Sequence, residues 1–143
     1  MPLPLPYRFL LALAAALPLA TPARAAPERV FYEPGNAEAA MAEGQVVLLD
    51  FFAPWCTTCR ARERVIDRLR DANPAYDETI AFITVDWDTY GQGDLARALA
   101  IPRRSTLVAM DGEAELGRVV AATSEADIKA LLDLALAAAQ AAG

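Results

Sequence analysis

The stretch 46–53, with the sequence VVLLDFFA, constrains the fold of this chain more than any other segment. It is almost continuously apolar and rich in β-branched and aromatic residues, and Asp50 is the only charged residue within it. A run of this kind is typical of a strand buried on both faces, in the middle of a parallel or mixed sheet. The segment therefore predicts a central strand rather than an edge strand.

Strand-like and helix-like segments alternate along the rest of the chain. The predicted strands are 30–32, 46–53, 79–85, 106–110 and 115–121, and the predicted helices are 36–43, 60–71, 94–100 and a last one after Ser124. Asp111-Gly112 marks a hairpin turn between the last two strands, and Ser124 with Asp127 resembles a capping box. The order β-α-β-α-β-α-β-β-α implies right-handed crossovers, a parallel portion and an antiparallel hairpin. It predicts a three-layer α/β sandwich with a mixed central sheet.

Residues 1–25 have the pattern of a secretory signal peptide. A basic residue, Arg8, precedes an apolar run over 9–17, and residues 23–25 supply an A-x-A cleavage pattern. The run is shorter than the ~20 residues that span a bilayer, which favours cleavage after residue 25 over an uncleaved inner-membrane anchor. We therefore expect 26–143 to be one exported domain, located in the periplasm.

Charge and composition exclude several classes of protein. The chain carries a net charge of −6, and the predicted signal peptide holds two arginines and no acidic residue, so the charge after cleavage is −8. An acidic chain lacks the electrostatic footprint of a nucleic-acid-binding protein. No nicotinamide or flavin motif is present, so we expect no cofactor, and the chain has no histidine for Ser-His-Asp or Cys-His catalysis.

The two cysteines, Cys56 and Cys59, lie where the buried strand ends and the amphipathic helix begins. Unpaired backbone N–H groups and the macrodipole at a helix N-terminus stabilise a negative charge. The thiolate is the nucleophile in disulfide exchange, so this position suits Cys56 as the attacking sulfur. Cys59, one helical turn further on, would then resolve the mixed disulfide. The spacing favours a redox-active pair.

Two other interpretations of the cysteine pair stay open. A zinc site normally needs four ligands, and the chain contains no histidine and no further cysteine, so metal binding would have to be shared between subunits. An inert structural bridge would close a loop of only four residues and would stabilise the fold little. Both alternatives are less favoured than redox chemistry.

The segment 47–59, VLLDFFAPWCTTC, resembles the thioredoxin family, and the resemblance covers essentially residues 30–138. It implies a thioredoxin-like three-layer α/β/α sandwich and a Cys56–Cys59 disulfide that exchanges with client proteins. It also implies that Asp50 accepts and donates the proton of Cys59. Burial should raise the pKa of Asp50, which suits proton transfer near neutral pH. The alternative is a structural aspartate bonded to backbone groups.

The resemblance further implies a client-binding surface formed by Trp55, Arg104, Ser105 and Thr106. The family usually carries a cis-proline just before the hairpin, and alignment of the strand that starts at Thr106 places Ser105 at that position. A second register places Pro102 there instead. A non-proline residue at this position implies a trans bond, or a cis bond at a cost of ~2.5–4 kcal/mol. The serine hydroxyl could hydrogen-bond a thiolate.

Other positions also depart from the family pattern. Phe82 stands where the family has a lysine beside the buried aspartate, so Asp50 is expected to lack an ion partner. Arg60, Arg62 and Arg64 give the next helix a basic start. We interpret these arginines as a solvated helical face, with stabilisation of a thiolate or contact with an acidic partner as the alternative.

Together these features predict a periplasmic thiol–disulfide oxidoreductase that is a monomer, and they favour a reductant over an oxidant. The dipeptide Thr57-Thr58 is neither the Gly-Pro of cytosolic reductants nor the Pro-His of strong periplasmic oxidants. A reductant would receive electrons from a membrane or periplasmic redox partner and pass them to client proteins. The alternative is a non-catalytic module that holds a metal or a client protein through the same thiols.

Overall fold

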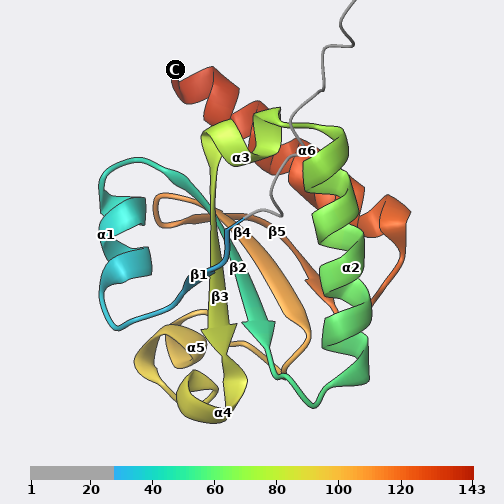
Figure 1. The fold of residues 1–143 in the computed structure, drawn as a ribbon. Coiled ribbons are helices and arrows are strands. Elements are labelled where there is room, and N and C mark those ends of the chain that lie inside the picture. Colours follow the sequence, from blue (N-terminus) through green and yellow to red (C-terminus); the bar gives the residue numbers. More distant parts are fainter. Residues whose placement is uncertain (1–27) are drawn as a thin grey trace, which may run out of the picture.

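The computed structural model describes residues 28–143, and the predicted signal peptide lies outside the described residues (Figure 1). The strands are β1 (Val30–Phe31), β2 (Val46–Phe52), β3 (Ile80–Asp86), β4 (Thr106–Asp111) and β5 (Ala114–Val120). The helices are α1 (Asn36–Ala42), α2 (Thr57–Ala72), α3 (Ala75–Thr79), α4 (Trp87–Tyr90), α5 (Asp94–Ala98) and α6 (Glu125–Ala142). Within the described part of the chain, no helix has both the length and the apolar character needed to cross a bilayer.

The five strands form one mixed sheet in the order β1-β3-β2-β4-β5. β1, β3 and β2 run parallel to one another, whereas β4 is antiparallel to both β2 and β5. β2 is the middle strand, so the prediction from its apolar run is confirmed, and β1 and β5 lie at the edges. The mixed α/β sandwich is therefore the observed fold.

Alternation along β2 divides the core between the two faces of the sheet, since successive side chains of a strand point to opposite faces. Val46 and Leu48 pack with α2, α3 and α6 on one face. Val47, Leu49 and Phe51 pack with α1 and α5 on the other. Figure 1 shows this arrangement, with α2 and α6 on one side of the sheet and α1 on the other. Both faces of β2 are covered, which explains its continuous apolar sequence.

Two short helices were not predicted, α3 with five residues and α4 with four. Neither is long enough to show a 3.6-residue periodicity, the pattern that identified α2 and α6. α2 also begins three residues earlier than predicted. The predicted cap of the last helix is present, because the Ser124 hydroxyl accepts a hydrogen bond from the backbone N–H of Asp127 at 3.4 Å.

Candidate active site

The end of β2 and the start of α2 place the two cysteines. Cys56 is the N-cap of α2, and its sulfur accepts a hydrogen bond from the backbone N–H of Cys59 at 3.2 Å. The two residues form a disulfide, with their Cα atoms 5.2 Å apart. Cys56 retains 5% exposure whereas Cys59 has none. Cys56, at the helix N-terminus, is thus the more exposed of the two residues, and its role as the attacking group stays a prediction.

Asp50 lies on β2 and does have an ion partner, so the prediction that it lacks one is wrong. Nη2 of Arg62 donates to Oδ1 of Asp50, and the two side chains form an ion pair. The cation comes from α2 instead of from β3, where Phe82 replaces the lysine of the family. Arg62 is also fully buried, which contradicts its interpretation as part of a solvated face. Arg60 and Arg64 are exposed, in line with that interpretation.

Burial raises the pKa of Asp50 above its usual value, and the charge of Arg62 opposes this rise. The Asp50 side chain retains 14% exposure. It lines a cavity of about 30 Å³ together with Glu63, Arg29 and Thr84. Roughly 10–15 Å³ of such space holds one water molecule, so this cavity has room for water beside the carboxylate. Water there could exchange a proton with Asp50.

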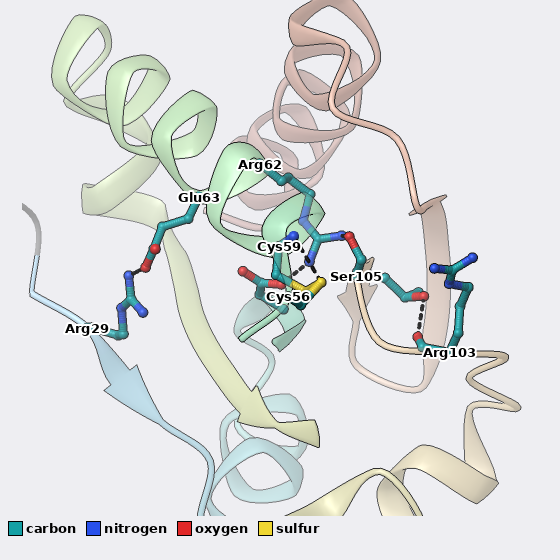
Figure 2. A network of polar contacts seen from close by, with 9 residues as sticks. Arg29, Cys56, Cys59, Arg62, Glu63, Arg103 and Ser105 are labelled. Carbon is teal, nitrogen blue, oxygen red and sulfur yellow. Dashed lines mark hydrogen bonds and ion pairs between the residues drawn. A yellow bond between two sulfur atoms is a disulfide. The ribbon is translucent and has the colours of Figure 1, made fainter. Parts of the chain in front are cut away.

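Ser105 directly precedes β4 and is held by contacts on every polar atom. Its backbone N–H donates to the carbonyl of Phe51 at 2.7 Å, and its own carbonyl accepts from Ala121 at 2.7 Å. Its Oγ accepts from Nη1 of Arg62 at 3.0 Å (Figure 2). The residue is fully buried and has a φ of 62°, a left-handed conformation that is uncommon outside glycine. These contacts fix a strained backbone at the site.

The structure also distinguishes the two registers considered for this loop, and it favours Ser105 over Pro102 at the position before β4. Ser105 is tied to the end of β2, whereas Pro102 is exposed three residues earlier. The described residues contain no cis peptide bond, so the Arg104–Ser105 bond is trans. The expected hydrogen bond from the serine hydroxyl to a thiolate stays a prediction, because the partner of Oγ in this oxidised state is Arg62.

Replacing Ser105 by proline should destabilise the protein, even though proline is the usual family residue at this place. Proline cannot adopt a φ of 62° and would remove the N–H bonded to the Phe51 carbonyl. We expect a loss of about 2 kcal/mol or more in urea unfolding. Ser105→Gly tolerates the backbone and loses only the Arg62 contact, so its cost should be smaller. A proline variant as stable as the parent would show that this backbone is not fixed.

Trp55 and Arg104, two of the predicted client-binding residues, lie together beside the disulfide. The Arg104 guanidinium stacks over the Trp55 ring, 4.4 Å from its centroid. The indole Nε1 donates to Oδ2 of Asp88 at 2.8 Å, and 54% of the Trp55 side chain remains exposed. Asp88, on α4, was not predicted. Arg104 therefore covers the ring and Asp88 binds its nitrogen, while the rest of the ring presents an apolar surface to solvent.

The remaining predicted residue, Thr106, begins β4 and is fully buried. Its hydroxyl donates to the backbone carbonyl of Arg103 at 2.8 Å, which shapes the loop ahead of the strand. Contact of Thr106 with a client stays a prediction. No group of three or more histidine, cysteine, aspartate or glutamate residues that could hold a metal occurs within residues 28–143.

Comparison with known proteins gives a consistent result. The thioredoxin family model matches residues 29–134. Thiol:disulfide interchange protein DsbD 2 of Pseudomonas aeruginosa is 33% identical over 129 residues, which is 85% of this chain but 22% of that protein. Thioredoxin of Echinococcus granulosus is 30% identical over 66% of this chain and 82% of its own length. The crystal structure of Trxlp from Edwardsiella tarda superposes with a TM-score of 0.63 and 29% identity, covering 72% of this chain and 97% of that one.

Proposed function

Because this chain belongs to the thioredoxin family and is a thiol–disulfide oxidoreductase with a CxxC site at Cys56–Cys59, we propose that it reduces disulfides of client proteins in the periplasm. The observation that carries this proposal is the position of the disulfide. Cys56 caps the N-terminus of α2 and is the more exposed of the two cysteines.

The reaction starts from the dithiol form. The Cys56 thiolate attacks one sulfur of a client disulfide, and the second client sulfur leaves as a thiolate that takes up a proton. Cys59 then gives its proton to the Asp50 carboxylate and attacks the Cys56 sulfur of the mixed disulfide. The bond between Cys56 and the client breaks, the client sulfur that was bound to Cys56 leaves as a thiolate and takes up a proton, and the Cys56–Cys59 disulfide forms. Two electrons pass from the dithiol to the client.

Export and the direction of electron flow rest on separate observations. The sequence of residues 1–25 has the pattern of a signal peptide, which supports export. The similarity to DsbD 2 supports a role in thiol–disulfide interchange, although this chain spans only 22% of that protein. Neither the chain nor the proposed reaction supplies reducing equivalents, so a membrane or periplasmic dithiol must re-reduce Cys56–Cys59.

The reduction potential of Cys56–Cys59 tests the proposed direction. Equilibration with glutathione redox buffers should give a value near that of thioredoxin, about −270 mV, and well below the roughly −120 mV of a strong periplasmic oxidant. A value near the oxidising limit would reverse the direction of the proposed reaction.

Export is tested independently of redox chemistry. Expression of the full chain in a Gram-negative host, followed by osmotic release and N-terminal sequencing, should yield a periplasmic protein that begins at Ala26. Retention in the membrane fraction with an intact N-terminus would support an uncleaved anchor instead.

A further inference from the structure

Arg62 occupies an unusual place for an arginine, since charged side chains are almost never fully buried unless they are paired. It lies one helical turn after Cys59 on α2, and both residues have no exposed surface. Residues three apart on a helix share a face, so the Arg62 side chain starts beside the inner sulfur. Figure 2 shows it reaching from α2 toward Ser105.

The guanidinium joins three separate parts of the site. Nη2 contacts Asp50 on β2, Nη1 donates to Ser105 before β4, and the side chain itself is rooted in α2. Its Nε has no hydrogen-bond partner among the described residues. Because a guanidinium is planar and rigid, the bond to Ser105 fixes the direction in which the other nitrogen meets Asp50. Ser105, whose backbone makes two further hydrogen bonds, thus serves as the anchor of the cation.

From this geometry we propose that Arg62 is the positioning residue of the proton-transfer step, favouring the carboxylate form of Asp50 and orienting it to accept the proton of Cys59. The inference rests on the proposed function and adds to it the group that keeps the base active. The proposed reaction needs a proton acceptor whenever Cys59 attacks the mixed disulfide, and a protonated carboxylic acid cannot fill that role.

The electrostatic reason lies in the opposing effects on Asp50. Burial favours the neutral carboxylic acid, and Arg62 is the largest of the influences that favour the carboxylate. Arg29, which is also paired with Glu63, favours the carboxylate of Asp50 more weakly than Arg62 does. Asp67 favours the neutral acid. Arginine does not lose its proton in proteins, so its charge stays constant while Asp50 and the thiols titrate. Removing it should leave Asp50 protonated over a wider pH range.

The test compares Arg62→Met, Arg62→Gln and Arg62→Lys with the parent protein. The readouts are the pH profile of client-disulfide reduction and the pKa of Asp50 followed by carboxyl-carbon NMR in the oxidised protein. Arg62→Met should raise both the midpoint of the pH profile and the pKa of Asp50, and should slow the reaction at pH 7 by about tenfold. Arg62→Lys retains the charge and should recover most of the rate.

Arg62→Gln separates electrostatics from packing, and it also carries the test if the methionine variant does not fold. Glutamine can still donate hydrogen bonds but bears no charge, so it should behave like methionine. Arg64→Met, which removes an exposed arginine from the same helix, should leave both readouts unchanged. A glutamine variant with the pH profile of the parent would overturn the inference. Absence of any exchange activity in the parent protein would instead overturn the proposed function.

Discussion

Replacement of Cys56 by serine is expected to lower the rate of client-disulfide reduction by at least about 1,000-fold. A serine hydroxyl at the N-cap of α2 is not ionised near neutral pH, so the attacking nucleophile is lost. The measurement is the steady-state reduction of a protein disulfide, with dithiothreitol as the electron source for the protein. The same reaction without protein gives the background rate.

The fold should survive this substitution, which makes the loss interpretable. The disulfide spans a sequence separation of three residues, and so short a loop contributes little to stability. The thermal midpoint of Cys56→Ser should therefore lie close to that of the reduced parent protein. Retention of more than a tenth of the activity by a folded Cys56→Ser protein would place the attacking group elsewhere.

Replacement of Asp50 by asparagine is expected to destabilise the protein by about 3–5 kcal/mol, because it leaves the Arg62 charge buried without a counter-ion. Arg62→Met should cost less at neutral pH, since Asp50 can take up a proton whereas Arg62 cannot lose one. Urea unfolding at pH 7 measures both effects. Asp71→Asn is the control: it removes an exposed carboxylate near the end of α2, the helix that carries Arg62. It should change the free energy of unfolding by less than about 0.5 kcal/mol.

The double variant Asp50→Asn/Arg62→Met completes this experiment. Removing both charges should recover much of the lost stability, so the two changes together should cost far less than their sum. The pH dependence gives a further check. Because the pKa of Asp50 is raised in the folded state, the parent should lose stability as pH rises from about 3.8 to the folded pKa, and this slope should vanish in the double variant. Additive single effects would show that the ion pair is not coupled.

The fold could be predicted because its central signals are local. The apolar run that forms β2, the helical pattern after the cysteines and the hairpin turn each occupy a short stretch of sequence. The position of the cysteine pair could be predicted as well, because the pair lies between a predicted strand and a predicted helix. Only α3 and α4 were not predicted: each is too short to show a helical period, although α5, which has the same length as α3, was predicted.

The partners of the site residues could not be predicted in the same way. In the sequence, Arg62 is one of several charged residues on an amphipathic helix. Its burial depends on contacts with Asp50 and Ser105, which are 12 and 43 residues away along the chain. Asp88 accepts a hydrogen bond from Trp55 although the two residues are 33 positions apart in the sequence. One signal was present, however. The missing lysine at Phe82 required a replacement cation for a buried aspartate, and α2 contains Arg62 at a helical spacing that faces the sheet.

A mixed-disulfide trap tests the account most directly. The Cys59→Ser variant keeps the attacking sulfur and lacks the resolving one, so it should accumulate adducts when it is incubated with periplasmic proteins under mildly oxidising conditions. Mass spectrometry should locate each adduct at Cys56, and Cys56→Ser with Cys59 intact should give few. The result that would contradict the account is a Cys59→Ser protein that forms no adducts while the parent protein copurifies with a metal.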